Sequence, residues 1–227
     1  MSNTITNETL IDVFKPPEFE PYAIKPFKQA VIDGEWIGVV NIWLVREHNN
    51  RLEVLFQKRP DNSYFAAGLF DVAVGGHYVQ GQYESGEHLL ESKEELGITL
   101  DKKKTYKLDR RLVALINQNT GRERKLVCDI YLSILEPYDS KLNTPEDEVA
   151  GLMWIEVNDL IDLYDNANKE YTVKGFDNKG KSTEYLVSSS SFISNFDGYH
   201  QKTARLIKLW HDGHIKLEPF AKPTQPS

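Results

Sequence analysis

Short apolar runs separated by polar turns recur through the first two thirds of the chain, and they predict β-strands. Residues 39–45 and 52–57 are rich in β-branched and aromatic side chains, which suit the pleated surface of a sheet. His48-Asn49-Asn50 lies between them and has the composition of a turn. The other predicted strands cover residues 71–74, 107–116, 126–135 and 151–157, and a polar turn over residues 117–121 joins the two long ones.

Helical periodicity appears at two places in the second half of the chain. Residues 158–164 begin a predicted helix with Asn158 as its N-cap. Residues 199–210 form an amphipathic pattern whose apolar side contains Leu206, Ile207 and Trp210. Strands interrupted by helices in this order predict an α+β fold.

The two ends of the chain differ in pattern from its middle. Residues 1–30 contain four prolines (Pro16, Pro17, Pro21 and Pro26), which favour an extended arm over a helix. Residues 171–176 and 183–187 flank a second predicted hairpin. We therefore expect an N-terminal arm (1–30), a main domain (31–170) and a C-terminal extension (171–227) packed on that domain. The helix over residues 199–210 has dimerisation as an alternative role.

Composition and charge narrow the class of protein. The chain has 227 residues with a net charge of −7, which argues against nucleic-acid binding through bulk positive charge. Its single cysteine excludes an intrachain disulfide framework and fits a reducing compartment. No apolar run is long enough to span a membrane, and the first residues do not form a signal peptide. We expect a soluble cytoplasmic protein.

Candidate chemistry is concentrated between two glycine positions. A double glycine, Gly75-Gly76, leads into a predicted helix over residues 85–96. Ser85 is the expected N-cap of this helix, and Gly97 is expected at the C′ position after it.

Three carboxylates, Glu91, Glu94 and Glu95, occupy the second half of this helix. Positions i, i+3 and i+4 share one helical face, where three like charges repel one another. A divalent cation relieves that repulsion, and Mg²⁺ prefers oxygen ligands. A surface helix with an acidic face is the alternative interpretation.

The spacing of these residues resembles the Nudix box, the signature of the Nudix hydrolase superfamily. The positions that match it in unbroken register are Gly76, Glu91, Glu94, Glu95, Gly97 and Ile98. Three positions depart from it. The first glutamate of the pattern is Gln82, its arginine is Leu90, and the apolar position after Glu91 is Ser92. In the family, that arginine and first glutamate brace the loop against the helix.

The resemblance implies a Nudix fold, a mixed β-sheet sandwiched between helices, here with an added C-terminal hairpin and helix. It implies a hydrolase that uses Mg²⁺ or Mn²⁺ to cleave a phosphoanhydride bond in a nucleoside diphosphate derivative or a related small pyrophosphate. Glu91, Glu94 and Glu95 would be both its metal ligands and its catalytic residues. The candidates for a further base are Glu146, Asp147 and Glu148, with a solvated acidic loop as the alternative.

Residues around the box are candidates for substrate binding, namely Arg59, Gly75, Gly76 and His77. Arginine binds phosphate oxygens in a bidentate manner. The predicted hairpin carries further basic residues at Arg110, Arg111, Arg122, Arg124 and Lys125, for most of which ordinary exposed charge is the alternative. A structural role is the alternative for His77. Tyr64, Phe65 and Trp36 would either stack on a base or belong to the core.

Four segments lead into the box, at residues 39–45, 57–59, 68–72 and 75–77. Together they resemble the isopentenyl-diphosphate isomerase-like branch of the superfamily, which includes uncharacterised bacterial hydrolases. The isomerases use a cysteine and a glutamate, whereas Gly75 and Leu126 stand at the corresponding positions here. We therefore reject isomerase activity and interpret Cys128 as a small buried hydrophobe. A second hypothesis follows from Gln82, Leu90 and Ser92, namely a noncatalytic Nudix module that binds a nucleotide-like ligand as a sensor.

Overall fold

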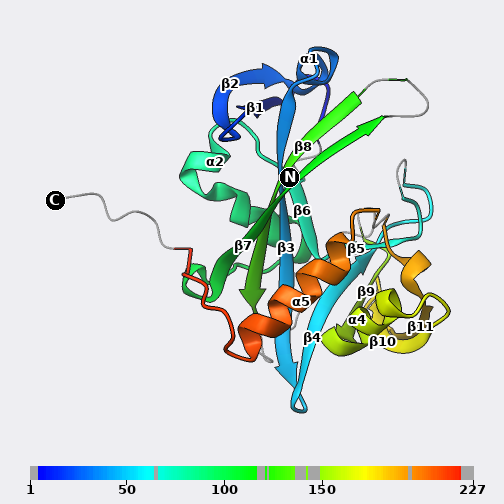
Figure 1. Cartoon of the computed structure of the whole chain (residues 1–227). Helices are drawn as coiled ribbons and strands as arrows, with labels where there is room; N and C mark the ends of the chain where they lie inside the picture. The colour runs from blue at the N-terminus through cyan, green and yellow to red at the C-terminus, as the bar shows by residue number, and fades with distance from the viewer. Residues whose placement is uncertain are drawn as a thin grey trace.

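One mixed sheet runs through the molecule, and its central strand is β3 (Trp36–His48) (Figure 1). The computed structural model describes residues 5–63, 66–116, 121, 123–135, 142, 149–193 and 196–220. β8 (Glu123–Ile134) runs parallel to β3 along one of its edges. Three strands pair antiparallel with the other edge in succession: β1 (Leu10–Lys15), β6 (Val74–His77) and β4 (Arg51–Lys58).

The remaining strands extend this sheet on both sides. They are β2 (Glu20–Pro26), β5 (Phe70–Val72), β7 (Thr105–Ile116), β9 (Gly151–Glu156), β10 (Tyr171–Asp177) and β11 (Ser182–Val187). The strands predicted from the sequence are all present. Asn49 and Asn50 join β3 to β4 with φ angles of 51° and 59°, which asparagine tolerates and a two-residue hairpin requires. The predicted turn over residues 117–121 lies outside the described residues except for Gly121.

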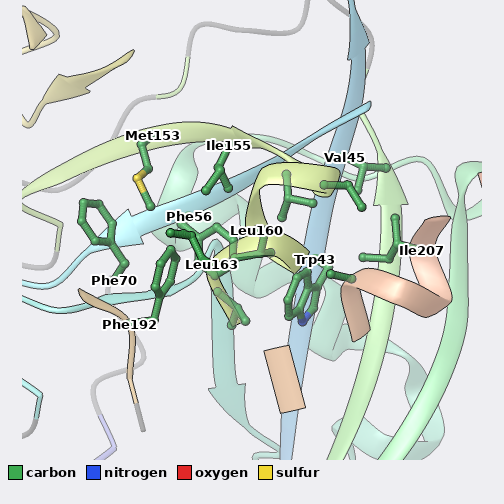
Figure 2. Close-up of a cluster of buried hydrophobic side chains, with 14 of the residues drawn as sticks. Trp43, Val45, Phe56, Phe70, Met153, Ile155, Leu160, Leu163, Phe192 and Ile207 are labelled. Carbon is green, nitrogen blue, oxygen red and sulfur yellow. The ribbon is translucent and has the colours of Figure 1, made fainter. Parts of the chain in front are cut away.

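Alternate side chains of β3 point to opposite faces of the sheet and supply two separate cores. On one face, Trp43 and Val45 pack with α4 (Val157–Asp165) and α5 (Tyr199–His211) (Figure 2). On the other face, Ile42 and Leu44 pack with η1 (Glu87–Leu90) and α3 (Glu91–Leu96). The sheet therefore lies between helices, which confirms the predicted α+β architecture. The other helices are α1 (Phe27–Ile32), α2 (Gln82–Ser85), η2 (Lys102–Lys104) and η3 (Ser189–Ser191).

The N-terminal segment is extended up to Pro26, as its prolines predicted, and it takes part in the sheet as a hairpin. β1 and β2 form an antiparallel hairpin, and β1 also pairs with β3 at Trp36 and Ile37. Pro21 and Pro26 both lie in β2, an edge strand, where a missing backbone donor is tolerated. α1 then begins directly after Pro26. Ile11, Val13 and Phe14 of β1 are buried, so this hairpin is an integral part of the sheet.

The predicted helix over residues 85–96 is instead three short helices. Gly86 has a φ of +70°, a left-handed conformation that separates α2 from η1. Ser85 is therefore the last residue of α2 rather than an N-cap, and its Oγ accepts a hydrogen bond from the Glu87 amide at 3.3 Å. Gly97, with a φ of +71°, ends α3 where the sequence placed the end, because glycine adopts this conformation without steric cost.

The C-terminal hairpin and helix are present as predicted. β10 pairs with β9 and continues the sheet, and α5 packs against α4 and the core on the Trp43 face. The buried residues of α5 include Ala204 and Ile207, so its own chain covers its apolar side. α4 begins at Val157 with Glu156 as its N-cap, which corrects the prediction for Asn158. Among the described helices, none is long and apolar enough to cross a bilayer.

Candidate metal and phosphate site

The glycine strand β6 lies next to the acidic helix α3. Gly76 is paired with Val40 of β3, and its missing side chain leaves the space that the Glu91 carboxyl group occupies. A Cβ atom on Gly76 would lie 2.8 Å from Cδ of Glu91, too close for any residue other than glycine without displacement. Glu91 is buried, with 8% of its surface exposed. Gly76, the first residue that matches the box, therefore lies where β6 and α3 approach each other closely.

Glu95 lies one helical turn after Glu91 and is bonded to the same strand. Its Oε2 accepts hydrogen bonds from the Gly75 amide at 3.3 Å and from Nε2 of Gln57 at 3.4 Å. Glu94 is half-buried on the same helix. α3 thus places Glu91 and Glu95 along consecutive glycines of β6, as their i, i+4 spacing predicted.

The chemistry of these donors fits a hard divalent cation, because Mg²⁺ and Mn²⁺ take carboxylate oxygens. Within the described part of the chain, no three histidine, cysteine, aspartate or glutamate side chains form a group that could hold a metal ion. The ligand role of Glu91, Glu94 and Glu95 therefore remains a prediction.

Local hydrogen bonds account for two of the three residues that depart from the resemblance, Gln82 and Ser92. Gln82 Oε1 accepts a hydrogen bond from the Val79 amide at 3.1 Å and closes the loop before α2. Ser92 is fully buried, and its hydroxyl lies 2.9 Å from the Leu89 carbonyl and 3.0 Å from the Ile98 carbonyl. Leu90 is 47% exposed, so an apolar residue replaces the family's arginine at a solvent-facing position.

Asp12 of β1 braces the loop from outside the box. Its carboxylate accepts hydrogen bonds from the Gly81 amide at 3.0 Å and the Tyr83 amide at 3.4 Å, at the start of α2. These amides have no partner within the helix, so a carboxylate here acts as an N-terminal cap. Because Asp12 is itself buried, the N-terminal hairpin and the glycine loop form one unit.

A second brace centres on Asp129, which is fully buried in β8. Nε of Arg110 donates to its Oδ1 at 2.7 Å, Nζ of Lys107 lies 2.9 Å from the same oxygen, and the Tyr78 hydroxyl donates to Oδ2 at 3.0 Å. Arg110 also donates to the Tyr83 hydroxyl at 3.0 Å, which ties the network to α2. Burial by itself raises the pKa of Asp129, but the hydrogen bonds and charges of Arg110 and Lys107 outweigh it and hold that pKa below its usual range.

His77 follows the glycines and faces a second arginine. Nη2 of Arg124 lies 2.9 Å from Nε2 of His77. A guanidinium only donates, so Nε2 of His77 accepts and the ring is neutral. Burial and the Arg124 charge lower the pKa of His77 to about 3. The ring also packs edge-on against Phe27 at 5.3 Å between centroids. This contact gives His77 a structural partner, and its substrate role remains a prediction.

The other basic candidates are paired with carboxylates. Arg59 lies 3.5 Å from Asp71, and Arg111 donates to Asp197 at 2.8 Å from Nη2. Trp36 packs edge-on against Phe19 at 5.0 Å between centroids, as a partly buried part of the core. The remaining candidates, Tyr64, Phe65, Arg122, Glu146, Asp147 and Glu148, lie outside the described residues.

Cys128 is buried in β8 with 3% of its surface exposed, as predicted for a small hydrophobe. Burial raises the pKa of its thiol to about 12, so the thiol is protonated and poorly nucleophilic near neutral pH. No isomerase chemistry is assigned to it.

Sequence reasoning missed Asp12 and Asp129. Each is a lone carboxylate inside an apolar run, Leu-Ile-Asp-Val-Phe and Cys-Asp-Ile-Tyr. Such a residue on a buried strand requires hydrogen-bonding or charged partners, and that was the available signal. The partners themselves come from other strands and from loops, so the sequence did not identify them.

The chain was compared with protein families, with known sequences and with solved structures. No protein-family model matches the chain. An uncharacterised Nudix hydrolase from Clostridium acetobutylicum is 27% identical over 208 residues, which are 88% of this chain and 97% of the relative.

Solved structures also resemble it. A Deinococcus radiodurans protein has a TM-score of 0.48 at 16% identity, covering 70% of this chain and 90% of that one. A binary complex of the Caenorhabditis elegans Ap4A hydrolase has a TM-score of 0.44 at 16% identity, covering 78% and 98%. Both TM-scores are under 0.5, so these likenesses carry no argument about function.

Proposed function

We propose that this chain is a member of the Nudix hydrolase superfamily and a divalent-metal-dependent hydrolase of phosphoanhydride bonds, which its 27% identity to an uncharacterised Nudix hydrolase supports. Its substrate would be a nucleoside diphosphate derivative or a related small pyrophosphate. The observation that carries this proposal is the position of Glu91 and Glu95 along the glycine strand β6. Two carboxylates of one helix are thereby held against the backbone of consecutive glycines, a donor set that suits a hard divalent cation.

Each residue has a role in this proposal. Glu91, Glu94 and Glu95 would hold Mg²⁺ or Mn²⁺, which supplies charge neutralisation and activates water when bound. Gly76 lets the Glu91 carboxyl approach the backbone of β6, and the Gly75 amide donates to Glu95. Asp12 and the Arg110–Asp129 pair keep the loop and α2 in place, a task that the missing arginine and glutamate of the box perform in the family.

The test is a hydrolysis assay on nucleoside diphosphate sugars, ADP-ribose, diadenosine tetraphosphate and inorganic pyrophosphate, each with Mg²⁺ or Mn²⁺. We expect turnover that EDTA abolishes and added metal restores. Glu94→Gln and Glu95→Gln should each lower kcat by about a hundredfold or more, since each removes a charge that acts on the transition state.

Glu87→Gln is the matched control, because Glu87 is an exposed glutamate of the neighbouring η1 helix. Its turnover should equal that of the wild type. Absence of turnover on every substrate, or full activity of Glu95→Gln, would refute the hydrolase proposal.

A noncatalytic, ligand-binding module is the second candidate. It is favoured by the bonds of Gln82 and Ser92, which serve the local fold, and by the exposed Leu90. It predicts that nucleotides raise the melting temperature with no hydrolysis over hours. Robust metal-dependent turnover would exclude it as the main role.

A further inference from the structure

Arg124 differs from the other arginines of the described chain in its lack of a counter-ion. A carboxylate lies within 4.0 Å of each of the others, which are Arg46, Arg51, Arg59, Arg110, Arg111 and Arg205. No described carboxylate forms such a pair with Arg124. Its Nε is buried and has no hydrogen-bond partner. Arg124 as a whole is partly buried, so its charge is partly removed from water without a counter-charge, and an anion would offset that cost.

The residues around Arg124 hold its guanidinium in place without neutralising it. Nη2 donates to the neutral His77, and the guanidinium lies over the ring of Phe27 at 5.6 Å. Phe27 and His77 also pack edge-on against each other, so the three side chains form one cluster. Burial lowers the pKa of Arg124, because loss of water disfavours the charged guanidinium. Both contacts orient the N–H donors of the guanidinium, and neither supplies a negative charge.

The cluster is adjacent to the glycine strand. His77 lies two residues after Gly75 on β6, a separation of roughly 7 Å along a strand, and the side chains of positions i and i+2 share a face. Gly75 has no side chain on that face. By the same alternation Gly76, against which the Glu91 carboxyl packs, faces the other side of the sheet. A ligand that contacts both Arg124 and α3 therefore has to cross the edge of β6, where the Gly75 amide meets Glu95.

We infer that Arg124, oriented by His77 and Phe27, binds a phosphate group of the ligand. The guanidinium would donate two parallel hydrogen bonds to the phosphate, and the phosphate would supply the missing counter-charge. This inference rests on the proposed function only in taking the anion to be part of the substrate. The binding itself requires no hydrolysis.

The experiment measures the dissociation constant of inorganic pyrophosphate by calorimetry, once with EDTA and once with Mg²⁺. The proteins are wild type, Arg124→Gln, Arg124→Lys and the control Arg51→Gln. Arg51 is 65% exposed and lies at the β3–β4 turn. We expect Arg124→Gln to weaken pyrophosphate binding at least tenfold and Arg124→Lys to weaken it less. Arg51→Gln should bind like the wild type.

Thermal unfolding without any anion separates a binding role from a structural one. If Arg124 binds a ligand, Arg124→Gln should melt no lower than the wild type, because a buried unpaired charge has been removed. A lower melting temperature together with unchanged pyrophosphate affinity would overturn the inference. So would a wild type that fails to bind pyrophosphate under both conditions. Arg124-dependent binding in a protein without turnover would refute the hydrolase proposal and leave the phosphate site standing.

Discussion

The buried carboxylate of Asp129 offers the sharpest test of the energetics described above. Asp129→Asn removes one negative charge and keeps the shape of the side chain, which is fully buried. Arg110 and Lys107 then lose the anion that both contact within 3 Å. Removal of one partner of a buried ion pair costs about 3–5 kcal/mol. Because Arg110 is 21% exposed and Lys107 42% exposed, water relieves part of that cost, and we expect about 3 kcal/mol.

Urea unfolding followed by tryptophan fluorescence measures this loss. The control is Asp165→Asn, since Asp165 pairs with Arg205 at the surface. That pair is exposed, so its loss should cost less than about 1 kcal/mol. A double-mutant cycle with Arg110→Met and Asp129→Leu isolates the coupling between the two side chains.

The pH dependence gives a second readout of the same site. The pKa of Asp129 lies below its usual range in the folded protein, so its contribution is fully present above the ordinary carboxyl pKa and is lost as the pH falls. Asp129→Asn should therefore lose less stability on acidification than the wild type. A variant within 1 kcal/mol of the wild type at pH 7, or a coupling energy near zero, would contradict the reasoning.

Two further predictions concern the loop and the helix beside it. Asp12→Asn removes the charge that caps α2, at a cost of about 1 kcal/mol, so hydrogen exchange of the Gly81 and Tyr83 amides should accelerate roughly fivefold. Exchange at the wild-type rate would mean that Asp12 does not hold the loop. His88 is buried, and burial lowers its pKa to about 4 from an ordinary value of 6.5, so stability is complete above pH 6.5 and falls by about 3 kcal/mol as the pH drops to 4. In His88→Phe the urea midpoint should change little between pH 6.5 and pH 4. His214→Gln, at an exposed position, should keep the pH dependence of the wild type. If His88→Phe also keeps that dependence, the assignment to His88 is refuted.

Local sequence patterns determined the strands and the end of the acidic helix. Val39 to Val45 reads as a strand because β-branched and aromatic residues suit a pleated surface, and that preference holds wherever the strand lies in the fold. Gly97 ends α3 because glycine alone adopts its left-handed conformation at no steric cost. The i, i+4 spacing of Glu91 and Glu95 placed both on one helical face, since helical geometry depends only on separation along the chain.

Contacts between distant segments were decided by the tertiary structure. Asp12 caps a helix about 70 residues away, and Arg110 reaches Asp129 from the neighbouring strand. In the sequence Arg124 is one basic residue among several, and only the fold shows that it lies beside His77 and pairs with none of the described carboxylates. The physical reason is that burial and charge pairing depend on which strands lie side by side. The spacing of Gly76, Glu91 and Glu95 is therefore a property of the sequence, whereas the brace formed by Asp12 and Asp129 is a property of the fold.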